Sequence, residues 1–176
     1  MTGIVRAARL EDVPDIYAMV RELAEYEKSL HEVRATPQDF EAALFGPSPA
    51  VFGHVVEHTN GAGTELAGFA LWFLNFSTWE GFHGIYLEDL YVRPHLRGHG
   101  YGKALLAALA KTCVERGYRR LEWWVLDWNE PAIGFYRSIG ATSMDEWTVQ
   151  RVTGEALLRL AQNGAAAGQR MSGEDD

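Results

Sequence analysis

The sequence is poor in cysteine, in long apolar runs and in basic residues. Its only cysteine, Cys113, has no partner for an internal disulfide. Because Cys113 falls on the apolar face of an expected helix, we interpret it as a small core residue rather than a nucleophile. No stretch approaches the roughly 18 uninterrupted apolar residues of a membrane span, and residues 1–9 lack the apolar segment of a secretory signal. We therefore expect a soluble, cytoplasmic protein with no membrane partner.

The shortage of basic residues gives the chain an acidic balance. Its 16 lysines and arginines stand against 24 aspartates and glutamates, for a net charge of −8 at pH 7. No basic run is interleaved with aromatic residues, so we expect no nucleic-acid partner. An acidic surface favours the approach of cations, although the same charge also serves ordinary solubility. A small, positively charged substrate therefore suits the field of this protein better than an anion.

Two histidine pairs have a spacing of four residues, which metal ligands take on one face of a helix. They are His54 with His58, and His95 with His99. Neither pair falls on an expected helix together with a third ligand. We predict no metal site.

With 176 residues, 47% of them hydrophobic, the chain has enough material for one α/β domain. We place this domain at residues 1–161 and expect residues 162–176, which are small, polar and rich in glycine, to form a disordered tail. Apolar periodicity predicts strands at residues 4–8, 51–58, 66–75, 85–92, 121–126 and 148–152. It predicts helices at residues 10–27, 36–44 and 129–139, and a long one that begins within residues 96–103 and ends before Gly117.

A glycine-rich segment, residues 97–103, follows the strand expected at residues 85–92 and opens the long helix. Glycines let backbone N–H groups crowd around an anion at the positive end of a helix, so a ligand with phosphates is one interpretation. A tight turn without a ligand is the other. The segment lacks the four-residue gap between two glycines and the hydroxyl residue after Lys103 that a phosphate-binding loop of the Walker type requires. Three strands precede the segment, which argues against a dinucleotide-binding fold.

Four segments together resemble the GNAT acetyltransferases, and within them the spermidine/spermine N1-acetyltransferase group, closest to its thialysine N-epsilon-acetyltransferase members. They are residues 86–92 (YLEDLYV), 97–102 (RGHGYG), 127–131 (DWNEP) and 135–136 (FY). The resemblance covers residues 4–161. It implies a GNAT fold, with a central mixed, mostly antiparallel sheet flanked by helices and splayed near residues 89–92. It also implies a homodimer.

The resemblance assigns two sets of site residues and makes acetyl-CoA the acetyl donor. Backbone groups of the strand would hold the pantetheine arm, and the glycine-rich segment would wrap the pyrophosphate. The implied cofactor residues are Leu90, Tyr91, Val92, Arg97, Gly98, His99, Gly100, Tyr101, Gly102, Lys103, Asn129 and Tyr136. The implied acceptor residues are Tyr26, Glu27, Ser77, Thr78, Trp79, Glu88 and Asp89.

Two residues are candidates for proton transfer. Only the neutral amine attacks the thioester. For an alkyl ammonium with a pKa of about 10.4, deprotonation at pH 7 costs a free energy of about 4 to 5 kcal/mol. Glu88 matches the family carboxylate that takes the amine proton, directly or through water, and Tyr136 matches the tyrosine that protonates the departing thiolate. Glu88 or Asp89 could instead be a solvated strand residue, and strand alternation lets only one of the two face the cleft. Tyr136 could instead be a packing residue of its helix.

These assignments predict direct transfer of acetyl to a primary amine in a ternary complex, because no nucleophile stands among the site residues. The polyamine enzymes resembled here have an acidic residue two positions before the tryptophan that corresponds to Trp79, whereas this chain has Ser77. A lysine-like amino acid such as thialysine, or a short diamine, is therefore expected in preference to spermine. A protein or peptide amine, an aminoglycoside, and a non-catalytic acetyl-CoA-binding module remain as alternatives.

Overall fold

The computed structural model describes residues 2–171 and divides the chain into two compact units, residues 1–126 and 127–176. The strands of the first unit are β1 (Thr2–Ala7), β2 (Phe52–Asn60), β3 (Gly63–Ser77), β4 (Phe82–Val92) and β5 (Leu121–Glu122). Its α-helices are α1 (Val13–Tyr26), α2 (Pro37–Phe45) and α3 (Tyr101–Arg116). Three short 3-10 turns, η1 (Leu10–Asp12), η2 (Leu30–Glu32) and η3 (Pro94–Leu96), complete the unit.

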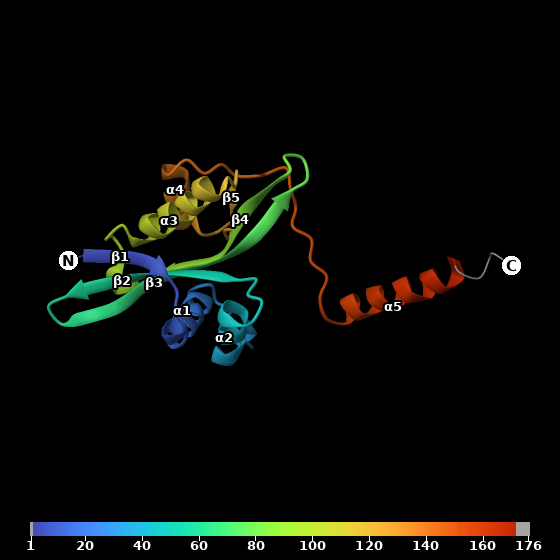
Figure 1. The fold of residues 1–176 in the computed structure, drawn as a ribbon, viewed down its shortest axis with the longest axis horizontal. Helices are drawn as coiled ribbons and strands as arrows, with labels where there is room; N and C mark the ends of the chain where they lie inside the picture. Colours follow the sequence, from blue (N-terminus) through green and yellow to red (C-terminus); the bar gives the residue numbers. More distant parts are fainter. Residues whose placement is uncertain (1, 172–176) are drawn as a thin grey trace. The chain divides into compact units, whose positions relative to one another are not determined.

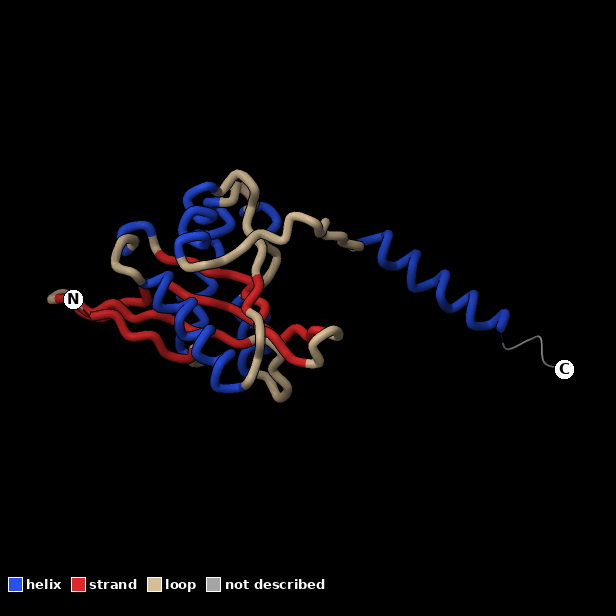
Figure 2. Tube along the Cα trace, turned by 90° about the horizontal axis from the view of Figure 1, so that it is seen from above, coloured by secondary structure: helices blue, strands red, loops and turns tan. Residues whose placement is uncertain are grey.

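The strands form one sheet in the order β1-β2-β3-β4-β5. Figure 2 shows the strands from above, in red. The first four strands are antiparallel neighbours, and β5 pairs with β4 in parallel. This confirms the predicted α/β class and the mixed, mostly antiparallel sheet. Strand β5 is shorter than the prediction of residues 121–126, and it pairs only with Ile85 and Tyr86 of β4. No strand in the described part of the chain pairs with this edge of β4 beyond Tyr86.

Helices cover both faces of the sheet (Figure 1). Helices α1 and α2 lie against one face, where their apolar side chains join those of β2, β3 and β4 in a single core. Helix α3 packs against β3 and β4 with Leu105 and Leu109, both 0% exposed. The predicted start of α2 and the predicted end of α3 are confirmed. Thr36 caps α2 by accepting a hydrogen bond from the Asp39 N–H, and Gly117 ends α3 in the left-handed conformation. Burial of these apolar faces stabilises the unit.

A buried ion pair connects β1 to the start of α1. The Arg6 guanidinium donates to both carboxylate oxygens of Asp12, at 2.6 and 2.9 Å, and its Nε donates to Glu57 at 2.5 Å. The Asp12 carboxylate also accepts the Arg9 N–H at 2.7 Å. Burial alone would raise the pKa of Asp12, but these hydrogen bonds outweigh it and hold the pKa below its usual value. Asp12 therefore orients the chain between the sheet and α1.

The second unit contains α4 (Glu130–Ser138) and α5 (Gly154–Met171). The strand predicted at residues 148–152 is wrong: these residues are irregular, and Val149 and Val152 are about half exposed. Their alternation suits a strand, but a strand needs a partner for its backbone groups, and no described segment pairs with them. Helix α5 continues through residues 162–171, where a disordered tail was expected; residues 172–176 lie outside the described residues.

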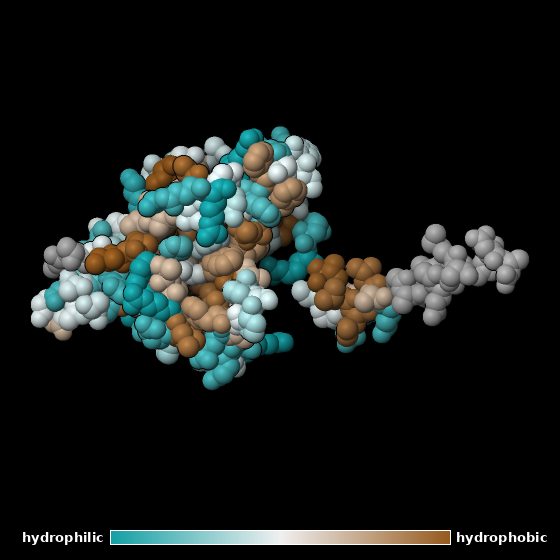
Figure 3. Space-filling model, viewed as in Figure 1, coloured by the Kyte–Doolittle hydropathy of each residue, from teal (hydrophilic) through white to brown (hydrophobic). Residues whose placement is uncertain are grey.

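Helix α5 has an apolar side in its first turns. Leu157, Leu158 and Leu160 are between 52% and 61% exposed, and hydrophobic atoms gather there in Figure 3. The helix is nevertheless interrupted by polar residues. No helix within residues 2–171 is long and apolar enough to cross a membrane.

We predict that Asp12→Asn destabilises the protein by about 2 to 3 kcal/mol at pH 7, because the partly buried Arg6 guanidinium loses its bidentate carboxylate partner and keeps only Glu57. The pKa of Asp12 is lowered in the folded state, so its contribution is present above the ordinary value of 3.8 and is lost as the pH falls below it. Denaturant unfolding at several pH values measures both effects. Equal unfolding free energies for mutant and parent at pH 7 would contradict this role.

Candidate active site

The glycine-rich segment forms a left-handed turn directly before α3. Gly98 and Gly100 have φ angles of 82° and 78°, which other residues rarely adopt. Gly100 is the N-cap of α3 and has no side chain that could cap the first N–H groups of the helix. A Cβ placed on Gly98 or Gly100 would meet nothing within 4 Å, so the space in front of this backbone is open. Open backbone N–H groups at a positive helix end fit an anion such as a pyrophosphate.

The unpaired edge of β4 leads into this turn. From Leu87 to Val92 the strand pairs with β3 on one side only, among the described residues. This is the splayed geometry expected near residues 89–92. Backbone groups on such an edge can form hydrogen bonds with an extended ligand, as a neighbouring strand would. Leu90, Tyr91 and Val92 thus lie where an extended pantetheine arm could pair with the sheet.

A register shift in β4 determines which face its side chains take. Leu71 of β3 pairs with Asp89, but the next residue, Trp72, pairs with Leu87, so Glu88 is an extra residue without a partner position. Leu87, before the bulge, is buried but does not belong to the core that contains the apolar side chains of α1. Tyr91, after the bulge, belongs to that core. The bulge interrupts the strand alternation at Glu88, so the argument that alternation lets only one of Glu88 and Asp89 face the cleft does not apply here.

Two carboxylates near this bulge, those of Glu88 and Glu27, act on the carboxyl group of Asp89. Burial raises the pKa of Asp89 to about 6, with further increases from the charges of Glu88 and of Glu27 at the end of α1. Burial also raises the pKa of Glu27. Glu88 is exposed to solvent. We call Glu27, Glu88 and Asp89 the acidic cluster; a cation beside it would relieve the repulsion.

Arg97 joins the glycine-rich turn to α1. Its guanidinium lies 5.6 Å from the ring centre of Tyr26 and 5.7 Å from that of Tyr91. Its Nε donates to the Val92 carbonyl at 3.0 Å. A residue expected to hold the cofactor thus contacts Tyr26, a residue expected to line the acceptor site. The structure brings the two predicted sets together at this point.

Glu22 and Arg93 belong to the same region, and the sequence reasoning missed both. Burial and then the Glu22 carboxylate raise the pKa of the Tyr91 phenol to about 12. Arg93 lies 3.5 Å from Glu22 and 3.1 Å from Asp15 of α1. Glu22 precedes Tyr26 by four residues, so a helical face shared with a predicted site residue was the signal that could have identified it.

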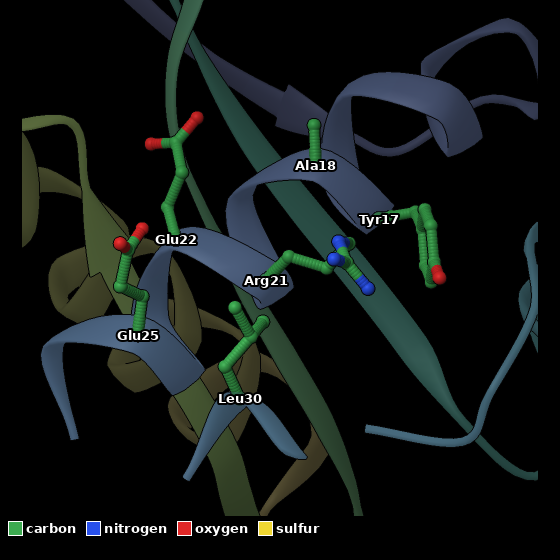
Figure 4. A pocket seen from close by; sticks show the side chains of 6 residues that line it. All are labelled: Tyr17, Ala18, Arg21, Glu22, Glu25 and Leu30. Carbon is green, nitrogen blue, oxygen red and sulfur yellow. The ribbon is translucent and has the colours of Figure 1, made fainter. Parts of the chain in front are cut away.

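A shallow groove of about 420 Å³ lies on the exposed side of α1, and Figure 4 shows its lining. It is lined by Tyr17, Ala18, Arg21, Glu22, Glu25 and Leu30. None of the predicted site residues lines this groove. Within residues 2–171, no group of three or more His, Cys, Asp or Glu side chains could hold a metal ion.

Ser77, Thr78 and Trp79 lie apart from the acidic cluster. Ser77 ends β3 and pairs with Phe82, and Trp79 in the following turn is 89% exposed. Ser77 stands six positions after Leu71, the partner of Asp89. At about 3.3 Å per residue this separation is roughly 20 Å. One copy of the chain does not bring these three residues to the cluster.

Asn129 and Tyr136 belong to the second unit. The Asn129 side chain caps α4 by accepting the Ala132 N–H at 3.4 Å. Tyr136 lies on α4, with its ring centre 5.3 Å from that of Phe135. The motif that contains Asn129 therefore has a local structural reason, the helix start. The roles of both residues towards ligands stay predictions.

The open edge of β4 passes through a bulge with carboxylates and leads into a glycine turn at the start of a helix. This arrangement fits an acyl-CoA-dependent transferase. Residues 14–141 match the Acetyltransferase (GNAT) family, and the chain belongs to this family. Together with the similarity to named N-acetyltransferases, this makes the protein an acetyl-CoA-dependent N-acetyltransferase.

Two curated relatives support this assignment, and a solved structure shares the fold. The chain is 36% identical over 164 residues to thialysine N-epsilon-acetyltransferase of Mus musculus, covering 89% of this chain and 96% of that protein. It is 31% identical over 201 residues to L-ornithine N5-acetyltransferase of Arabidopsis thaliana, covering 91% and 88%. An integron cassette protein from the mobile metagenome of V. cholerae superposes with a TM-score of 0.74 at 26% identity, covering 92% and 98%. The predicted resemblance to thialysine-type members is confirmed.

We predict that Asp89→Asn stabilises the protein at pH 7 by roughly 1 to 3 kcal/mol, because the folded state no longer resists ionisation of this carboxyl. The folded pKa is raised to about 6 from an ordinary value of 3.8. The parent therefore loses stability as the pH rises from about 4 through 6, and the difference from the mutant disappears below about pH 4. Melting temperatures across this range measure the effect, with Glu41→Gln as an exposed control. A difference that does not change with pH would contradict the burial of Asp89.

Proposed function

We propose that this protein transfers acetyl from acetyl-CoA to the primary amine of a small cationic acceptor, a lysine-like amino acid such as thialysine or a short diamine. The observation that carries the proposal is the acidic cluster of Glu27, Glu88 and Asp89 at the bulge of β4. Burial and the charges of Glu88 and Glu27 raise the pKa of Asp89, so a bound ammonium that offsets this negative charge is favoured. The acetyltransferases similar to this chain include two that are named for amino acids with a side-chain amine.

The residues of the glycine turn suit acetyl-CoA, which supplies the acetyl group as a thioester. Residues 97–103 hold the pyrophosphate with backbone N–H groups, and Lys103 adds a positive charge beside them. The backbone of Leu90, Tyr91 and Val92 holds the pantetheine arm along the open edge of β4. Asn129 contacts the same arm.

Two side chains move protons. Glu88 accepts a proton from the ammonium of the acceptor, directly or through water, and its exposure leaves a path for that proton to solvent. The Tyr136 hydroxyl donates a proton to the leaving sulfur. None of the assigned site residues is a covalent nucleophile, so acetyl passes directly to the amine within a ternary complex.

Ser77 and Thr78 place hydroxyl groups among the proposed acceptor residues. A polyamine enzyme would need another carboxylate there to pair with a second ammonium of its substrate. Ser77 and Thr78 can form hydrogen bonds with the polar groups of an amino acid but cannot neutralise a distal ammonium. Trp79 offers an exposed ring to a cation. Because these residues lie far from the acidic cluster of their own chain, the proposal includes a homodimer in which a second copy brings them closer, which a molecular mass measured in solution tests.

The acceptor preference is tested by thiol release from acetyl-CoA with thialysine, lysine, ornithine, putrescine, spermidine, spermine, an aminoglycoside and a lysine peptide. We expect kcat/KM for the best amino acid or diamine to exceed that for spermine by about tenfold or more, since each unpaired ammonium taken from water is costly. A preference for spermine would overturn the acceptor class. Thiol release with the peptide or aminoglycoside alone would identify one of the alternative acceptors.

We predict that Tyr136→Phe lowers kcat by about 100-fold or more and leaves the Kd of acetyl-CoA nearly unchanged, because the proton is needed only as the thiolate leaves. Steady-state kinetics and calorimetry measure the two quantities. Tyr118→Phe, which removes a hydroxyl elsewhere in the chain, is the control. Turnover that survives the loss of the Tyr136 hydroxyl would rule out its role as the acid.

A further inference from the structure

A chain of hydrogen bonds, buried at its His58–Tyr101 end, connects the turn between β2 and β3 to the glycine-rich turn. The Ala62 N–H donates to Asn60 Oδ1 at 2.8 Å, which identifies the other end of the Asn60 side chain as the amide nitrogen. That nitrogen lies 3.3 Å from His58 Nε2 and can only donate to it. His58 Nδ1 lies 2.6 Å from the Tyr101 hydroxyl. Because Nε2 accepts, the neutral imidazole carries its proton on Nδ1 and donates to Tyr101.

The ring of Tyr101 packs closely against the sheet, beside Gly3 of β1 and His58 of β2. Gly3 of β1 pairs with His58 of β2, and a Cβ at Gly3 would collide with the Tyr101 ring. His58 is 2% exposed and Tyr101 is 7% exposed. The first residue of α3 is therefore fixed by its side chain to the β1–β2 part of the sheet, through one close packing contact and one hydrogen bond.

The neighbouring His99 strengthens this attachment. Its ring stacks on Tyr101 with an interplanar angle of 15° and centres 5.6 Å apart. His99 Nδ1 lies 3.2 Å from the carbonyl oxygens of Leu96 and Arg97. The two stacked side chains belong to the residues that flank Gly100 in the sequence.

The glycine turn needs such an attachment. Gly98 and Gly100 contribute no side chain to packing, and glycine loses more conformational freedom on ordering than any other residue. A turn that is already ordered binds an anion without that cost, because its N–H groups are held in the binding arrangement. Tyr101 is the residue of the turn that is anchored in the core.

We propose that His58 is a positioning residue for acetyl-CoA: by holding the Tyr101 hydroxyl, it keeps the backbone of residues 98–102 in the conformation that receives the pyrophosphate. The proposal rests on the assignment of this turn to acetyl-CoA under the proposed function. His58 itself touches neither donor nor acceptor. Its effect is confined to the pyrophosphate end of the donor and does not reach the proton transfers.

The test compares three variants with the parent by calorimetric titration with CoA and by thermal unfolding. Tyr101→Phe keeps the ring and removes the hydroxyl; we expect the Kd for CoA to rise about three- to tenfold, the scale of one buried hydrogen bond. His58→Leu removes the same bond from the other side and should raise the Kd by a similar factor. His58→Asn places an amide nitrogen close to the position of Nδ1, so we expect its Kd to lie nearer to that of the parent.

A matched control separates positioning from general destabilisation. Trp72→Phe removes the other aromatic-to-histidine hydrogen bond of β2, in which the indole N–H donates to His54 Nδ1 at 3.1 Å. We expect this variant to lower the melting temperature and leave the Kd for CoA unchanged. If it weakens CoA binding as much as Tyr101→Phe does, the proposal is overturned.

A donor without the pyrophosphate makes the test specific. S-acetylpantetheine contains the thioester and the arm but lacks the group that the turn is proposed to hold. We expect Tyr101→Phe to lower kcat/KM for acetyl-CoA and to leave kcat/KM for S-acetylpantetheine unchanged. Equal losses with both donors, or a Kd for CoA equal to that of the parent, would refute the positioning role. Failure of the parent itself to bind CoA would instead refute the assignment of the turn to acetyl-CoA.

Discussion

The register of β4 against β3 is the constraint on which the rest of the site depends. The extra residue at Glu88 shifts the alternation of the strand: Leu87 before it is buried away from the core beneath α1, and Tyr91 beyond it joins that core. The same strand has lost its β5 partner after Tyr86. One bulge therefore places carboxylates and an open backbone edge next to each other, in the last residues before the glycine-rich turn.

Electrostatics then connect the two halves of the site. Arg97 of the turn lies over Tyr26 and Tyr91, while Glu27, the residue after Tyr26, raises the pKa of Asp89. Positive charge thus gathers at the end where an anion would bind, and negative charge at the end where an ammonium would bind. A cation bound beside Asp89 would lower the pKa of this carboxyl group again and so favour release of its proton.

The glycine-rich turn combines an open backbone with a rigid support. Gly98 and Gly100 leave the space before the helix start free, which a side chain would fill. The support comes from residues distant in sequence, Gly3 and His58, on which the Tyr101 side chain rests. A turn made only of glycines would have to be ordered by its ligand. Here the sheet supplies part of that order.

The sequence by itself determined the elements whose signals are local. Thr36 at a helix start, Gly117 at a helix end and the glycines before α3 act through neighbouring backbone groups. The order of strands and helices through residue 139, the mixed sheet and the family could therefore be predicted from the sequence, whereas helix α5 was not. The bulge at Glu88, the contact of Arg97 with Tyr26, the distance of Trp79 from Asp89 and the irregular conformation of residues 148–152 were decided only by the tertiary structure. These features depend on which distant segments pair and at which register, and no short-range pattern of residue types specifies that pairing.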